Sequence, residues 1–194
     1  FYQIKVEDVK YAILTGMEMH LAEIDLITKN QEAPTFENTI EAMERAGRPL
    51  NRAFTYYGIF SGNLSSPEFR EVQGELAPKI SEYSSKITQN EALFSRIKAV
   101  YDASQEHPLE AEQQRVVELV YTQFEMGGAN LSAEKKAGYA EINKELSTLY
   151  TQFSNNVLHD EENYISYLTE DQLGGLPEDF VKSAAKIATD NGKD

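Results

Sequence analysis

The sequence lacks several features that would mark particular classes of protein. It contains no cysteine, so disulfides, thiolate nucleophiles and thiolate metal sites are excluded. No apolar run approaches the ~20 residues that a membrane-spanning helix needs, so we expect no membrane partner. Basic residues are few: 18 Lys and Arg oppose 32 Asp and Glu, giving a formal charge of −14. They are also scattered, and binding phosphates requires clustered basic side chains, so we expect no nucleic-acid partner.

Histidine is also scarce, which rules out the common helical metal motifs. A zincin site needs His-Glu-x-x-His on one helix, and a di-iron bundle needs Glu-x-x-His pairs. The three histidines are His20, His107 and His159, and none of them is preceded or followed by Glu at these spacings. Gly127-Gly128 follows a predicted helix rather than a strand, which is the wrong context for a phosphate loop. The sequence predicts no catalytic, cofactor-binding or metal-ligating residue in this chain.

What the sequence does contain is helical periodicity along nearly its whole length. Its 194 residues, 41% apolar and 26% charged, are typical of a globular protein with one sizeable core or two small ones. The apolar stripes and their boundary signals predict helices over residues 6–29, 35–57, 67–87, 90–106, 109–126, 132–157 and 177–189. Aromatic residues lie mainly on these stripes, so we expect them to pack in the core.

Some residues refine this pattern. Thr35 is expected to cap the second helix through its hydroxyl, with Glu37 near the positive end of the helix dipole. Gly47 and Pro49 predict a kink or a division within that helix. Pro78 predicts a bend in the third helix rather than its end, because the apolar stripe continues in phase beyond it.

The short predicted loops favour an all-α fold, an antiparallel bundle or array of about six to seven helices. Residues 164–168 alternate and are rich in aromatic and β-branched residues, so they are expected to be extended or to form a short strand. We predict an N-terminal helical domain over residues 1–163 and the truncated start of a following segment over 164–194. The missing initiator Met and the polar end lead us to expect a piece of a longer polypeptide.

A few polar clusters could imitate a site, and each has a simpler interpretation. His20 with Glu23 could form one edge of a metal site, but is read as a helix-surface pair. His159-Asp160-Glu161-Glu162 is read as a solvated helix end that should fray, since acidic side chains are unfavourable there. Two pairs of carboxylates at helical spacing could imitate a general acid and base, and both are read as surface charges. These pairs are Glu37 with Glu41 and Glu141 with Glu145. Adjacent or alternating tyrosines could line a binding surface, namely Tyr56-Tyr57 and Tyr164 with Tyr167.

One short segment is distinctive as an amino-acid sequence. Pro34-Thr35-Phe36-Glu37-Asn38-Thr39 resembles the Pro-Thr-Phe-x-Asn-Thr segment near the N-terminus of the thimet-oligopeptidase-like zinc metallopeptidases. Further stretches resemble the same family in order and at similar spacing, and they are residues 23–25, 38–44, 77–79, 90–97, 128–132, 141–149, 153–158 and 173–177. The peptidyl-dipeptidase branch looks nearest, with oligopeptidase A as its close competitor.

The resemblance implies a role that the residues alone do not. In this family a mostly helical enzyme encloses a deep channel, and zinc is held by a His-Glu-x-x-His helix in the C-terminal half. The zinc-bound water attacks the peptide with the motif's Glu as base. By resemblance, this chain is the non-catalytic N-terminal part, one wall of a channel that admits short peptides. Its expected partners are the C-terminal catalytic domain of the same polypeptide and short peptide substrates.

Two other interpretations stay open from the sequence. The chain could be a free-standing helical interaction module that uses exposed tyrosines and acidic faces, or a helical oligomerisation domain. We expect a soluble protein, and the sequence does not choose between cytoplasm and periplasm. It also leaves open whether the full enzyme releases dipeptides or cleaves internally.

Overall fold

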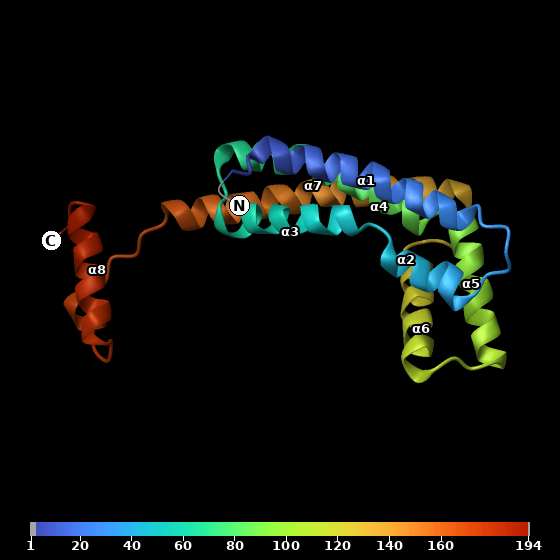
Figure 1. Cartoon of the computed structure of the whole chain (residues 1–194). Helices are drawn as coiled ribbons and strands as arrows, with labels where there is room; N and C mark the ends of the chain where they lie inside the picture. The colour runs from blue at the N-terminus through green and yellow to red at the C-terminus, as the bar shows by residue number, and fades with distance from the viewer. Residues whose placement is uncertain (1–2, 194) are drawn as a thin grey trace. The chain divides into compact units, whose positions relative to one another are not determined.

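The computed structural model describes residues 3–193 and confirms the all-α prediction (Figure 1). In chain order the elements are α1 Val6–Thr28, η1 Phe36–Glu41, α2 Ala42–Arg45, α3 Arg48–Asn63, α4 Pro67–Thr88, α5 Glu91–Glu106, α6 Ala111–Met126, α7 Ala133–Asn163, η2 Glu170–Gln172 and α8 Glu178–Asp190. Residues 164–169 belong to no helix or strand, and no strand occurs within 3–193, so the strand considered for 164–168 is wrong. Within 3–193 no helix combines the length and apolar character that crossing a bilayer requires.

The chain divides into two compact units, Phe1–Asn155 and Asn156–Asp194, with the division inside α7. In the first unit, α1 lies against both α3 and α4. Figure 1 shows the chain direction reversing from α1 to α3 and again from α3 to α4. The domain division predicted at residue 163 stays a prediction.

The first core cluster lies among α1, α3 and α4. Its buried members are Val6, Val9, Ile13, Met17, Leu50, Ala53, Phe60, Phe69, Val72 and Leu76. Those from α1 recur every three or four residues, which places them on one face. Gly16 lets α3 approach this face, because a Cβ on Gly16 would lie 3.0 Å from the backbone Cα of Leu50. The close contact between α1 and α3 therefore depends on a missing side chain.

The second core cluster joins the end of α1 to η1, α5 and α6. Its buried members are Ile24, Ile27, Ile40, Leu93, Phe94, Ile97, Val100, Val117, Phe124 and Ala129. Because α1 contributes to both clusters, this one helix connects the two halves of the first unit.

The second predicted helix is divided, as Gly47 and Pro49 indicated. It begins as the short π-helix η1, continues as α2, and stops at Gly47, whose φ of +70° lies in the left-handed region that glycine tolerates. The capping prediction for Thr35 is confirmed, since its hydroxyl accepts a hydrogen bond from the backbone N–H of Asn38 at 3.2 Å. Pro78 lies inside α4, which continues to Thr88, so the prediction that the helix does not end there is also confirmed.

The longest helix, α7, departs from the expectation that aromatic residues pack in the core. Within the first unit, Ile142, Leu149, Tyr150 and Phe153 are 60%, 50%, 67% and 67% exposed. The 3-4 spacing of apolar residues correctly predicted a helix with one apolar face. That pattern does not say whether a partner lies on the face, and in the described chain this one has none to bury it.

The second unit is small and exposes most of its apolar side chains. Phe180 and Ile187 of α8 are 52% and 57% exposed, and Tyr164 is 76% exposed. The core expectation is therefore wrong for Phe180 too, whereas Tyr164 is one of the tyrosines that the sequence set apart from the core. A single short helix and its flanking segments have too little apolar surface to enclose a core of their own.

Candidate functional site

The Pro-Thr-Phe-Glu-Asn-Thr segment, residues 34–39, is held in place by a side chain from α5. Arg96 is only 7% exposed. Its Nη1 donates to the carbonyl oxygens of Asn30 at 2.9 Å and Glu32 at 3.2 Å, and its Nη2 donates to Oδ1 of Asn38 at 2.9 Å. A buried guanidinium is tolerated when such acceptors replace water. Arg96 therefore ties the loop after α1 to the start of η1.

Asn38 is the centre of this arrangement. Its Oδ1 also accepts from the backbone N–H of Thr35 at 2.8 Å and from the hydroxyl of Thr39 at 2.9 Å, while its Nδ2 donates to the carbonyl of Ala33 at 2.9 Å. The amide is thus fully used in shaping the backbone. The segment provides structure rather than a reactive group, and sequence reasoning missed that its anchor is Arg96.

His20 and Glu23 lie close on α1 but face different partners. Nδ1 of His20 lies 2.5 Å from the hydroxyl of Tyr83 on α4, and Oε2 of Glu23 accepts from the backbone N–H of Gly47 at 2.6 Å. Burial lowers the pKa of His20, and the Glu23 carboxylate partly offsets this. Nε2 of His20 is buried without a partner. The pair therefore joins α1 to the start of α3 and to α4, instead of forming an edge of a metal site.

The other carboxylate candidates are not brought together as a site. Oε1 of Glu41 accepts from Nε of Arg45 one turn along the helix at 3.0 Å, and Glu37 is exposed. Glu141 and Glu145 are both exposed on α7. Across residues 3–193, no three His, Asp or Glu side chains gather closely enough to hold a metal ion.

The acidic stretch after His159 forms the last turn of α7. Nδ2 of Asn163 donates to the carbonyl of His159 at 2.7 Å and lies 3.1 Å from its Nδ1. A hollow of about 540 Å³ is lined by His159, Asp160, Glu161, Asn163 and Tyr164. With its side chains exposed and no buried polar group pointing into it, this hollow has the character of a solvated helix end.

The tyrosine candidates have different surroundings. Tyr56 and Tyr57 both pack against the first core cluster, and the Tyr57 ring lies 5.4 Å from that of Phe69. Burial raises the pKa of Tyr57. In the second unit, Nζ of Lys193 lies 5.5 Å from the ring centre of Tyr167. The adjacent Tyr56 and Tyr57 can both contact the first core cluster because each is only half-buried.

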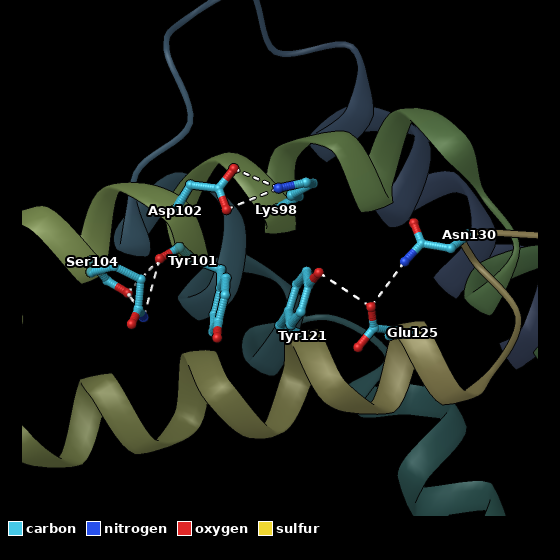
Figure 2. Close-up of polar contacts among 8 residues, drawn as sticks. Lys98, Tyr101, Asp102, Ser104, Tyr121, Glu125 and Asn130 are labelled. Atoms are coloured by element: carbon cyan, nitrogen blue, oxygen red, sulfur yellow. Dashed lines mark hydrogen bonds and ion pairs between the residues drawn. The ribbon is translucent and has the colours of Figure 1, made fainter.

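A cluster that the sequence did not indicate lies where α5 packs on α6 (Figure 2). Tyr101 and Tyr121 stack with ring centres 4.1 Å apart and planes 8° apart. Oε1 of Glu125 accepts from the Tyr121 hydroxyl at 3.4 Å and from Nδ2 of Asn130 at 3.0 Å. These contacts connect α5, α6 and the loop before α7.

The comparison with known proteins identifies the family of the chain. Residues 11–136 match the family model described as Neurolysin/Thimet oligopeptidase, N-terminal domain. The chain belongs to this family. The matched region runs from α1 to the start of α7 and includes the contact between Asn38 and Arg96.

Relatives in bacteria match almost the whole chain. Dipeptidyl carboxypeptidase of Escherichia coli (strain K12) is 29% identical over 100% of this chain and 29% of its own length. Oligopeptidase A of Haemophilus influenzae is 31% identical over 99% of this chain and 28% of its own length. Oligopeptidase A of Salmonella typhimurium is 29% identical over 95% of this chain and 27% of its own length. The chain thus spans less than a third of the length of each of these relatives.

Proposed function

We propose that this chain is the N-terminal, non-catalytic helical part of a zinc-dependent oligopeptidase or peptidyl-dipeptidase that hydrolyses short peptides. The observation that carries the proposal is the family match over residues 11–136, together with relatives named as peptidases whose matches extend over almost the whole of this chain. Zinc in the remaining part of the polypeptide would activate the attacking water. The residues of this chain would form a wall of the substrate channel.

The structure supports a scaffolding role in two ways. Its buried polar side chains, such as Arg96 and Asn38, are used to fix the backbone. Its longest helix exposes apolar side chains, as expected of a region that packs against further polypeptide. The same exposure favours the second candidate, a free-standing interaction module, so the two functions need a test that separates them.

The first test is to determine the coding sequence that follows the codon for Asp194. A His-Glu-x-x-His motif encoded within the few hundred codons after Asp194 supports the peptidase, and a stop codon directly after Asp194 supports the interaction module. The second test is metal analysis of the full-length product and of this chain after equilibration with zinc. The proposal expects stoichiometric zinc on the full-length protein and none on the chain. Stoichiometric zinc on the chain, or none on the full-length protein, contradicts it.

A further inference from the structure

Helices α3, α4 and α7, together with the end of α6, line an open groove of the first unit, and this lining is uncharged. The groove has a volume of about 680 Å³ and lies between α3, α4 and α7. Its apolar and aromatic lining includes Phe54, Tyr57, Ile80, Leu146 and Tyr150, and uncharged polar side chains such as those of Ser81, Ser84 and Asn143 line the rest. None of the described side chains that line it is charged, although 26% of all residues are charged. Depletion of charge is typical of the core of an interface rather than of a free surface.

Part of one wall of the groove belongs to an apolar stripe on α7, since Leu146 and Tyr150 line the groove. The same stripe continues outside the groove with three further exposed residues, Ile142, Leu149 and Phe153. The spacings of one, three and four residues place all five on one side of the helix. A surface helix normally turns its apolar stripe toward the protein.

Toward α4, by contrast, α7 presents polar side chains. Oγ of Ser147 donates to the carbonyl of Ala77 at 3.2 Å, and Asn143 and Thr151, one turn away on either side, are half-buried. These three polar residues also line the groove, and the packing of α7 on this unit leaves its apolar stripe uncovered.

We propose that an apolar helix from the part of the polypeptide outside this chain fills the groove and packs on Tyr57, Leu146 and Tyr150. This inference rests on the proposed function, in which the chain is one part of a longer peptidase. The relatives have room for such a helix, since more than two thirds of each lies outside the match. A groove lined by helices suits a further helix, whose side chains interdigitate with theirs.

Other occupants fit the groove less well. A second copy of the chain would bring a further formal charge of −14 to an acidic protein, and like charges oppose association. A small molecule would remain open to solvent beside Tyr150, which is 67% exposed, whereas ligand sites enclose most of the ligand.

The test measures how fast a thiol in the groove reacts. The chain has no cysteine of its own, so Tyr150→Cys introduces one thiol into it, and Tyr11→Cys is a matched control on α1, where Tyr11 is 72% exposed and does not line the groove. Each variant is made in this chain and in the full-length protein, and maleimide labelling is followed on the peptide that carries the new cysteine. Leu146→Cys, at the other residue of the stripe that lines the groove, provides a second readout.

In this chain we expect both thiols to react at similar rates. In the full-length protein, labelling of Tyr150→Cys should slow by about tenfold or more relative to Tyr11→Cys, because a covered thiol reacts only when the interface opens. Equal rates in the two proteins, or equal slowing at both positions, overturn the inference. If labelling of Tyr150→Cys in this chain becomes slower as the chain concentration rises, a second copy of the chain covers the groove, and the inference is overturned.

The zinc content of the same full-length preparation separates this inference from the proposed function. If the full-length protein binds zinc and Tyr150→Cys is labelled as fast as in this chain, the inference about the groove is refuted and the proposed function stands. A protein without zinc in which Tyr150→Cys is protected supports the groove occupant and refutes the peptidase.

Discussion

A buried guanidinium destabilises a protein unless its N–H groups find acceptors. The fold provides acceptors for Nη1 and Nη2 of Arg96, whereas its buried Nε has none. Two backbone carbonyls and the Asn38 side chain surround the guanidinium, all from the segment that follows α1. The segment in turn has few partners of its own, since residues 31–33 are exposed. The charge and the loop therefore stabilise each other.

Arg96→Ala should lower the free energy of unfolding by about 3 kcal/mol, because it leaves buried acceptors without a donor. Arg115→Ala is the control, since Arg115 is exposed and only pairs with Glu118 along α6. Its effect should stay within about 0.5 kcal/mol. Urea unfolding of both variants measures the difference. Equal effects would show that Arg96 does not anchor the loop.

His20 predicts how stability depends on pH. Burial lowers its pKa below the usual 6.5, so the unfolded chain takes up the proton first as the pH falls. His20 therefore contributes its full stabilisation above about pH 6.5 and loses it toward the lower pKa of the folded state. The difference in unfolding free energy between the natural chain and His20→Gln should be smaller at pH 5 than at pH 8. A constant or wider difference at pH 5 would refute the assignment.

Within the helices, one glycine lies on an open surface and another lies at a close contact between two helices. A Cβ on Gly58 of α3 would meet nothing within 4 Å, whereas one on Gly16 of α1 would press on Leu50. In this chain, Gly58→Ala should raise the free energy of unfolding by about 0.5–1 kcal/mol through helix propensity. Gly16→Ala should lower it by about 1–3 kcal/mol through overpacking. Thermal or urea unfolding of the two variants tests the pair, and the same sign for both would contradict the packing of α1 on α3.

The helices also show what a sequence pattern can and cannot reveal. Capping by Thr35 and the break at Gly47 were predictable, because a hydroxyl at a helix start and a flexible residue beside Pro49 act locally. The π-helical form of η1 was not, because it accompanies contacts with α5 and α6. The exposed side of α7 was not predictable either, since periodicity reports a stripe and not its partner.

For the whole molecule, the all-α class and the family were both predictable from the sequence. The contact between Asn38 and Arg96 was not, although both residues lie in stretches that resemble the family, because 58 positions separate them and only the fold brings them together. The cluster of Tyr101 and Tyr121 was missed for the same reason, since its members come from two helices. Long-range contacts decide which polar residues form structure, and local patterns do not contain them.

The central claim is that this chain is a helical part of a peptidase that does not itself catalyse. The most direct measurement is turnover of a quenched short peptide by this chain and by the full-length protein, each with zinc and with a metal chelator. We predict turnover by the full-length protein that the chelator abolishes and zinc restores, and none by the chain. Zinc-dependent turnover by the chain alone, or none by the full-length protein, would contradict the claim.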